Sequence, residues 1–406
     1  MSLSAYWPIL RKRQVQVVIV ASVVAGLRIG LPLALILLVE EQAGDFASAG
    51  AVAGAFTLAS ALSGPPKGRV IDRRGQPRVL MPLAISSALS LVALVAVARS
   101  DASVVALVAL ATLAGITTAP LFPSMRTLWP DLVDDVSQLE TAYSIQAIVG
   151  EIFYISGPLV AGVLLAVGTP TAAVLALTGI ELAGVLAFAA TPTSRRWRGE
   201  PREVGWTGAL ASPGIRTLTA ISLPFGATFG LLDVAIPAFA ESRGDEAAAG
   251  VIFAAFAVGS MLGGVVYGAR SWGDSDPGFR LAVFIAALAV LVVPLALAET
   301  NLALTLLAGV AGTTVAPAVT VEYRLLDDVA PTGTATEAMS WIVTAYGTGV
   351  AIGAACSGPL ADGPGTDTAF LAAAACCGVA ALIPLARRRS LRADAALRAL
   401  PAESPG

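Results

Sequence analysis

The sequence predicts an all-α integral membrane protein whose twelve transmembrane helices form two six-helix bundles related as a parallel repeat. Three observations support this fold class. The 406-residue chain is 56% hydrophobic and 13% charged, and its mean hydropathy of +0.79 is far above the usual balance of a soluble domain. Its basic residues fall on one side of the apolar stretches. Its second half repeats sequence features of the first half at a nearly constant spacing.

Twelve predominantly apolar stretches are each long enough to cross a hydrocarbon core of about 30 Å. In the first half they cover residues 15–39, 46–66, 79–98, 103–124, 141–167 and 171–190. In the second half they cover residues 215–239, 247–268, 280–298, 301–323, 335–360 and 368–386. The first stretch is too long for the core of a signal peptide and leads directly into further spans, so we expect it to be a retained helix.

The distribution of Lys and Arg predicts the orientation, because these residues accumulate in short cytoplasmic loops. With the N-terminus inside, the inner segments hold all but three of the 25 basic residues. Arg99 and Arg243 fall outside, and Arg28 lies within a span. One missed or extra helix would reverse part of this distribution. We therefore expect an even number of spans in the plasma (inner) membrane, with both termini cytoplasmic.

The two halves of the chain repeat each other. Residues 54–68 read GAFTLASALSGPPKG and residues 254–268 read AAFAVGSMLGGVVYG, while AGITTAP at 114–120 is answered by AGTTVAP at 311–317. Because each copy holds an even number of spans, both copies have the same orientation. Parallel repeats of this kind occur in membrane transporters, which place a shared site near mid-membrane between the copies.

A segment rich in Pro, Gly and Arg separates the copies and is expected to be a linker. The predicted organisation is an N-terminal six-helix bundle at residues 1–190, a cytoplasmic linker at 191–214, a C-terminal six-helix bundle at 215–389 and a cytoplasmic tail at 390–406.

The composition argues against an enzyme. The chain has no histidine, which is the commonest metal ligand and general base. Its three cysteines lie in predicted spans, and an odd number of cysteines argues against a disulfide framework. A membrane enzyme acting on lipid would need clustered carboxylates or a catalytic His or Cys in a polar loop, and a transporter-like sensor would usually append a sizeable soluble domain. We expect no metal, no cofactor and no nucleic-acid partner. The expected partners are the lipid bilayer, a small-molecule substrate and protons as a candidate coupling ion, with the chain acting as a monomer.

The predicted loop between helices 2 and 3 carries the most specific motif. It reads GRVIDRRGQPRVL, from Gly68 to Leu80. This resembles the loop signature of the major facilitator superfamily, G-x-x-x-D-R-x-G-R-R/K-x-x-L, with Gln76 and Pro77 in place of two expected basic residues. The positions assigned to this gate motif are Gly68, Asp72, Arg73, Gly75 and, one place late, Arg78. With the duplicated twelve-span plan, the resemblance covers nearly the whole chain and implies a transporter that works by alternating access.

The motif is expected to form an inner gate. Ser60, Gly64 and Gly68 are four residues apart and form a stripe of small residues that allows close helix packing. The resemblance implies that Asp72 meets the start of helix 11, where a helix N-terminus favours an anion. That start reads TATE, residues 334–337, which is a capping box.

A second motif lies in predicted helix 5. The run GPLVAG resembles the G-P-x-x-G-G signature of proton-driven exporters in the same superfamily, matching at Gly157, Pro158 and Gly162. The resemblance implies proton-coupled export, with Pro158 opening the helix and the glycines allowing close packing. Such exporters carry an arginine within helix 4, which this sequence lacks, and Arg28 is the alternative source of that charge.

Charged residues inside predicted spans are the default candidates for a transport site, because each is costly in the bilayer without a partner. Arg28 and Glu151 are at comparable depths and could pair, either as a fixed structural ion pair or with a role in substrate or proton coupling. Glu181 is the weaker candidate, since helix 6 usually supports the bundle from its periphery in this family. Glu322 is expected to make charge contacts at the inner surface.

Asp233 shares a helix face with Phe225 and Phe229. A carboxylate beside two aromatic rings suits a cationic or amphipathic ligand, although aromatic packing with Asp233 reaching outer water explains the pattern equally well. Tyr154 and Trp341 complete the predicted aromatic lining, with interface or core packing as the alternative.

These features predict a secondary active transporter, with proton-coupled efflux of a small amphipathic or cationic compound as the specific hypothesis. The alternative is uptake or facilitated transport of a small polar metabolite such as a sugar.

Overall fold

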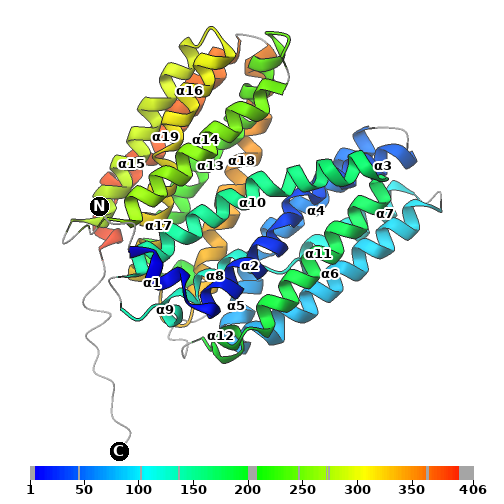
Figure 1. The fold of residues 1–406 in the computed structure, drawn as a ribbon, viewed down its shortest axis with the longest axis horizontal. Helices are drawn as coiled ribbons and strands as arrows, with labels where there is room; N and C mark the ends of the chain where they lie inside the picture. Colours follow the sequence, from blue (N-terminus) through cyan, green and yellow to red (C-terminus); the bar gives the residue numbers. More distant parts are fainter. Residues whose placement is uncertain are drawn as a thin grey trace, which may run out of the picture.

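The protein folds into two helical bundles (Figure 1). The computed structural model describes residues 5–43, 46–100, 103–135, 138–199, 208–245, 247–270, 272, 275–362 and 365–392, and every regular element in this part of the chain is helical. Eleven helices are long and apolar enough to cross a membrane, and a shorter apolar helix covers Ser48–Leu62. The predicted all-α fold is confirmed.

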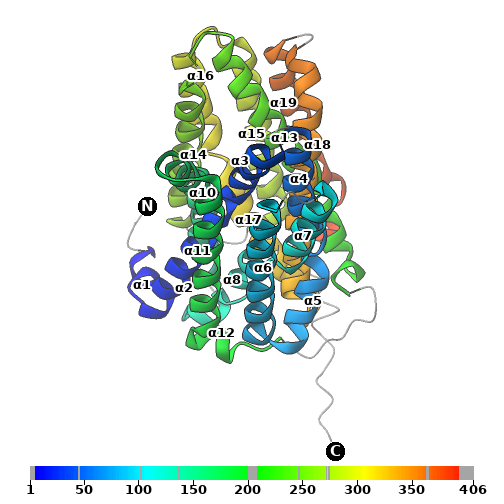
Figure 2. The same ribbon diagram turned by 90° about the vertical axis from the view of Figure 1, so that its right-hand side faces the viewer.

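The first bundle is built from six spans joined by short helices. Its spans are α2 (Arg13–Gly26) with η2 (Leu27–Gly30) and α3 (Leu31–Ala43), α4 (Phe46–Leu62), α6 (Gln76–Ala98), α7 (Val104–Thr117) with α8 (Leu121–Arg126), α10 (Leu139–Val167) and α11 (Pro170–Ala190). The short helices α1 (Trp7–Leu10), α5 (Gly64–Arg74), α9 (Trp129–Leu132) and α12 (Pro192–Arg196) all lie near one end of the bundle (Figures 1 and 2).

The second bundle has the same plan. Its spans are α13 (Pro213–Glu241), α14 (Ala247–Gly268), α15 (Pro277–Val292) with η5 (Val293–Leu297), α16 (Asn301–Gly312) with α17 (Val315–Val329), α18 (Ala335–Asp362) and α19 (Thr366–Ala386). The single turns η4 (Gly208–Ala211) and η6 (Arg388–Leu391) flank it. Within the predicted linker and tail, residues 200–207 and 393–406 lie outside the described part of the chain.

The sequence repeat is visible as repeated packing. Each of the heptapeptides at 114–120 and 311–317 includes the break that splits its span into two helices. Gly115 lies so close to the backbone carbonyl of Phe56 that a Cβ would clash with it, and Gly312 lies equally close to the carbonyl of Phe256. Glycine is therefore retained at this position in both copies because the facing backbone leaves no room for a side chain.

The two bundles meet at one end and diverge towards the other, where α3 and α16 lie apart (Figure 1). At the closed end α5 packs against α18, and α10 packs against α14. The closed end carries most of the exposed arginines of α5 and α12, including Arg73, Arg74, Arg195 and Arg196, and we call it the basic end.

Candidate functional site

The candidate site lies where the two bundles diverge and is defined by four residues, Arg28, Glu151, Tyr154 and Asp233, whose surroundings we call the central cleft. Tyr154 on α10 marks its position. Its side chain is 58% exposed, yet it lies within electrostatic range of Arg28 and Glu151 in the first bundle and of Asp233 in the second. Because charges from both bundles act on this one exposed side chain, Tyr154 projects between them.

Arg28 is paired with Glu181 and not with Glu151, the partner considered from the sequence. Its Nε lies 3.8 Å from Oε1 of Glu181, whose side chain is 5% exposed against 30% for Arg28. Glu151 forms no ion pair with Arg28 among the described residues. The reason is helix packing: Gly184 of α11 lies directly against the backbone of Ala25 of α2, which brings Glu181, one turn away, beside Arg28. Glu181 is therefore the ion-pair partner of Arg28, and its weaker rank as a transport candidate stays a prediction.

Lys67 joins this group and was not singled out from the sequence. Its side chain is buried, and its Nζ donates a 2.7 Å hydrogen bond to the carbonyl of Thr118, at the break between α7 and α8. Lys67 lies within electrostatic range of Arg28 and Glu181. Two basic side chains thus lie within electrostatic range of one carboxylate inside the first bundle.

Glu151 connects the bundles. Its Oε1 accepts a 2.7 Å hydrogen bond from the Oγ of Ser260 on α14, and Ser260 is fully buried. A carboxylate of the first bundle is therefore held by a hydroxyl of the second, an arrangement that only the contact between α10 and α14 provides.

Asp233, on α13 of the second bundle, is exposed and lies within electrostatic range of Tyr154. It has no hydrogen bond or ion pair within the described ranges. Phe229 lies one turn before Asp233. The centroid of its ring is 5.7 Å from that of Tyr346 and 6.0 Å from that of Phe256. The ring centroids of Phe225 and Phe229 are 5.2 Å apart, but Phe225 is only 4% exposed. Phe225 therefore supports, from within the core, the aromatic wall formed by Phe229 and Tyr346.

Trp341 is half-buried and packs against the core. Its indole N–H has no acceptor among the described side chains and backbone groups. Its predicted role in the lining stays a prediction.

The gate motif joins the bundles at the basic end. The Asp72 carboxylate accepts hydrogen bonds from the backbone N–H groups of Thr336 at 3.0 Å and Glu337 at 2.9 Å. The resemblance implied a contact between Asp72 and the start of transmembrane helix 11, which is α18, and this contact is present. Burial raises the pKa of Asp72 to about 6, against the opposing effect of these hydrogen bonds.

The basic partner in this gate is Arg69, which sequence reasoning missed. Its Nη2 lies 2.7 Å from Oε1 of Glu337, whereas Arg73 and Arg78 are exposed and form no ion pair within the described residues. Arg69 lies one turn before Arg73 on α5, on the face that meets α18.

The glycines of the motif have separate roles. A Cβ on Gly68 would lie 2.8 Å from the backbone N of Glu337, so Gly68 lets α5 touch the start of α18. Gly75 adopts a φ of +84°, which favours glycine. Gln76, which replaces an expected basic residue, is fully buried and donates to the carbonyl of Ser124 at 2.9 Å. This departure from the family signature therefore fills a buried position inside the first bundle.

The repeat produces a second contact on the other side of the basic end. Gly264, equivalent to Gly64, accepts hydrogen bonds through its carbonyl from Tyr6 at 3.0 Å and Ser144 at 2.6 Å. The carbonyl of Gly268 accepts from Thr141 at 2.8 Å. These contacts between the bundles join hydroxyl donors to backbone carbonyl acceptors.

A salt bridge completes this second side. Arg280, at the start of α15, places its Nη2 2.8 Å from Oε1 of Glu140, at the start of α10, and donates to the Tyr267 hydroxyl at 2.9 Å. Glu140 is the repeat equivalent of Glu337, so each bundle offers a glutamate at the same place and the opposite bundle supplies an arginine.

A third contact lies between these two. Arg126 ends the fourth span, is 1% exposed, and places its Nη2 2.6 Å from Oδ1 of Asp327 on α17. Tyr143 donates to the other oxygen of the same carboxylate. The sequence assigned Arg126 to an inner loop, but α8 extends the fourth span to include it. Glu322, expected at the surface, is buried and accepts from Ser222 at 2.7 Å.

The linker ends also touch the gate. A Cβ on Gly199 would clash with the carbonyl of Asp72, and the backbone N–H of Ala209 donates to Oε1 of Glu337 at 3.2 Å. Both members of the Asp72 and Glu337 pair are therefore contacted by the segment that joins the bundles.

The two glycines of the helix 5 motif differ in their packing. Gly157 lies against η2, where a Cβ on Gly30 would clash with the carbonyl of Gly157. A Cβ on Gly162 would meet no atom of another element within 4 Å, so Gly162 takes no part in close packing. The expected opening at Pro158 was wrong, because α10 continues from Leu139 to Val167 without interruption.

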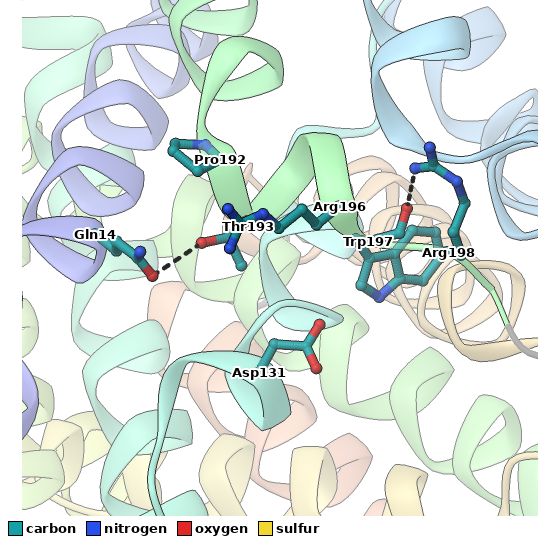
Figure 3. Close-up of a pocket in the computed structure, with 7 residues that line it drawn as sticks. All are labelled: Gln14, Asp131, Pro192, Thr193, Arg196, Trp197 and Arg198. Carbon is teal, nitrogen blue, oxygen red and sulfur yellow. Dashed lines mark hydrogen bonds between the residues drawn. The ribbon is translucent and has the colours of Figure 1, made fainter.

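A pocket of about 440 Å³ lies apart from the central cleft, near α9 and α12 at the basic end (Figure 3). Asp131 and Trp197 line it, and the Arg198 guanidinium turns away from it towards the carbonyl of Trp197. None of the predicted site residues lines this pocket. No group of three or more potential metal ligands occurs in the part of the chain that the structure describes.

Comparison with known proteins agrees with this architecture. The family model described as the Major Facilitator Superfamily matches residues 17–273 and 218–403. No curated protein sequence matches the chain. A crystal structure of a bacterial homologue of the iron transporter ferroportin in an outward-facing state is 14% identical, with a TM-score of 0.73, covering 93% of this chain and 100% of that one. The same protein with soaked iron has a TM-score of 0.67 at 14% identity, with 93% and 99% coverage.

The human organic anion transporter MFSD10 has a TM-score of 0.66 at 16% identity, covering 94% of this chain and 100% of that one. At these identities the likeness concerns the fold. The apolar spans, the duplicated bundles and the matched family model agree with one another over nearly the whole length. The chain is a multi-pass membrane protein and belongs to the major facilitator superfamily.

Proposed function

We propose that the protein is a secondary active transporter that exports a small amphipathic or cationic compound in exchange for protons. Membrane transport is supported by the family and the fold. The hydrogen bond between Ser260 and Glu151 across the two bundles is the observation that carries the proposed proton coupling.

The orientation follows from the charges. The exposed arginines of α5 and α12 gather at the basic end, and basic residues are enriched on the cytoplasmic side of membrane proteins. With the basic end in the cytoplasm, both predicted termini are inside. In this proposed orientation, the contacts at the basic end support a closed inner gate, with the two bundles diverging towards the outside.

Proton coupling requires a titratable group whose surroundings change between the two states. Glu151 meets this requirement, because α10 and α14 belong to different bundles and alternating access moves the bundles relative to each other. Opening the basic end would part these helices and remove the hydrogen bond from Ser260. The charge state of Glu151 would then be linked to the conformation of the transporter.

A cationic substrate is supported by the second wall of the central cleft. Asp233 is exposed there without an ion-pair partner in the described structure, next to the rings of Phe229 and Tyr346. A carboxylate and aromatic faces both attract organic cations.

The test uses proteoliposomes loaded with ethidium, an amphipathic cation, with and without an imposed pH gradient. We expect the gradient to accelerate ethidium movement by about tenfold in the wild type and to have no effect in Glu151→Gln. Glu41→Gln, which neutralises an exposed carboxylate at the end of α3, is the matched control and should behave as the wild type.

Equal ethidium movement with and without the gradient in the wild type would show that antiport is wrong. Gradient-independent movement of a polar metabolite such as glucose, with no movement of ethidium, would favour facilitated transport instead.

A further inference from the structure

We propose that the central cleft is a bipolar site, in which Arg28 binds an anionic group and Asp233 binds a cationic group of one molecule, so that the preferred substrate is a zwitterion with an apolar or aromatic body. This inference rests on the proposed function, since it takes the central cleft to be the transport site. It narrows the substrate class from any small amphipathic cation to molecules that carry both charges.

The positive wall of the proposed site is formed by Arg28. Glu181 approaches Arg28 only at Nε, at 3.8 Å, and the two terminal nitrogens of the guanidinium have no partner within the described residues. The Arg28 side chain is 30% exposed. Lys67 lies within electrostatic range of the same pair, so a second positive charge acts on Glu181. Arg28 therefore keeps its planar, two-nitrogen edge free for a carboxylate or phosphate.

The second step concerns the negative wall. Asp233 lies on the opposite bundle, exposed and without a partner in the described chain. Arg28 and Asp233 form no ion pair with each other. Neither charge is therefore compensated by the other, and each is available to an oppositely charged group of a ligand.

The third step places both charges at one site. Tyr154 is within electrostatic range of Arg28 and of Asp233, and Tyr346, in the aromatic wall, is within range of Tyr154 and Asp233. The two charges therefore flank the same exposed tyrosine. The surface between them is aromatic, formed by Tyr154, Tyr346 and Phe229.

The final step compares ligands. Closure of the central cleft removes water from both walls, and an ionised group without a partner is costly in such surroundings. A purely cationic ligand pairs with Asp233, but Arg28 then keeps only its contact with Glu181. A purely anionic ligand pairs with Arg28 but leaves the charge of Asp233 uncompensated. A zwitterion compensates both walls at once, and an aromatic body fits the surface between them.

The experiment measures thermal stabilisation of the purified protein by matched probes that share one ring. The first set is tryptophan, tryptamine and indole-3-propionate, and the second is phenylalanine, phenethylamine and 3-phenylpropionate. We expect at least one zwitterion to raise the melting temperature at a concentration about tenfold lower than its matching amine and its matching acid.

Variants identify the two walls. Arg28→Gln combined with Glu181→Gln removes the positive wall without leaving a buried unpaired carboxylate, and it should cancel the advantage of the zwitterion over the amine. Asp233→Asn should cancel its advantage over the acid. Glu41→Gln is the matched control and should keep both advantages.

Amines that stabilise as well as their zwitterions would overturn the inference, as would a complete absence of stabilisation by all six probes. The measurement contains no pH gradient, so it does not depend on proton coupling. A result with amines alone would leave the proposed export of cations standing, whereas a failure of coupling in proteoliposomes would leave the charge preference of the site unaffected.

Discussion

The carboxylate of Asp72, in the first bundle, accepts a 2.9 Å hydrogen bond from the backbone N–H of Glu337, in the second. Thr336 donates a second one. Asp72 therefore occupies the N-terminus of α18, where the unpaired N–H groups of a helix favour a negative charge. Since the two helices belong to different bundles, we expect this contact to break when the basic end opens.

Removing the Asp72 carboxylate should open the basic end. Hydrogen bonds to a charged group contribute about 1.5–3 kcal/mol each, and about 1.4 kcal/mol changes an equilibrium tenfold. We expect Asp72→Ala to lower the ratio of closed to open basic ends by about tenfold or more. Spin labels at Gln42→Cys and Leu302→Cys, with the native cysteines replaced by serine, report this as a shorter distance between the outer ends of α3 and α16.

Arg73→Ala, at an exposed position of the same loop, is the control for this experiment and should leave the distance distribution unchanged. An unchanged distribution in Asp72→Ala would show that the contact does not hold the gate.

The gate should close more firmly as the pH falls. Burial in the closed state raises the pKa of Asp72 from 3.8 to about 6, and exposure in the open state would return it towards its ordinary value. The state with the higher pKa binds the proton more tightly and is therefore favoured by acid. The closed population should rise between pH 7 and pH 4, and Asp72→Asn should remove this contribution. The same label pair measures it, and a closed population that falls over this range would contradict the assignment.

Gly30 in η2 and Gly162 in α10 should respond differently to the same substitution. A Cβ at Gly30 would clash with the backbone of Gly157, so Gly30→Ala should destabilise the protein by about 1–3 kcal/mol. Gly162 has open space around it, and Gly162→Ala should be neutral or stabilising by up to about 1 kcal/mol, because alanine favours the helix. Thermal unfolding in detergent compares them. Equal losses would mean that this packing is not formed.

The salt bridge between Arg280 and Glu140 should tolerate exchange of its charges. Glu140→Arg places two positive charges together and should reduce ethidium transport by about tenfold or more, by the rule that a buried charge needs a partner. Adding Arg280→Glu should recover a large part of it, although the hydrogen bond from Arg280 to Tyr267 is lost. If the double variant is no better than the single one, the pair does not act as a unit.

Removal of Arg28 alone should be more damaging to folding than removal of Arg28 and Glu181 together. Breaking a buried pair on one side costs about 3–5 kcal/mol, because it leaves an uncompensated charge. We expect Arg28→Gln to lower the melting temperature more than the double glutamine variant does. The reverse order would show that Glu181 does not depend on Arg28.

The sequence could predict the fold and the gate contact because both depend on local patterns. Apolar length and basic loops are read directly from the chain, and the position of Asp72 follows from one short motif. The partner of Arg28 could not be predicted in this way. Its choice between Glu151 and Glu181 depends on how closely α11 packs on α2, which is decided by the contact between Gly184 and Ala25.

Two further residues show the same limit. Arg126 was assigned to a loop because the apolar stretch ends just before it, whereas α8 extends the span and buries its side chain. An arginine at the end of one span with an aspartate near the end of its repeat, as in Arg126 and Asp327, is a signal that could have identified this pair. Pro158 leaves α10 continuous, because one missing N–H does not interrupt a long helix that is supported on both sides.

The segment between the bundles also sets a mechanical limit. Gly199 packs on Asp72 and Ala209 is hydrogen-bonded to Glu337, so the connecting chain is anchored at both halves of the gate. The intervening chain of about ten residues can extend to at most about 35 Å. As the basic end opens, its two anchor points must separate within that reach, and the linker thereby acts as a tether that bounds the stroke of each transport cycle.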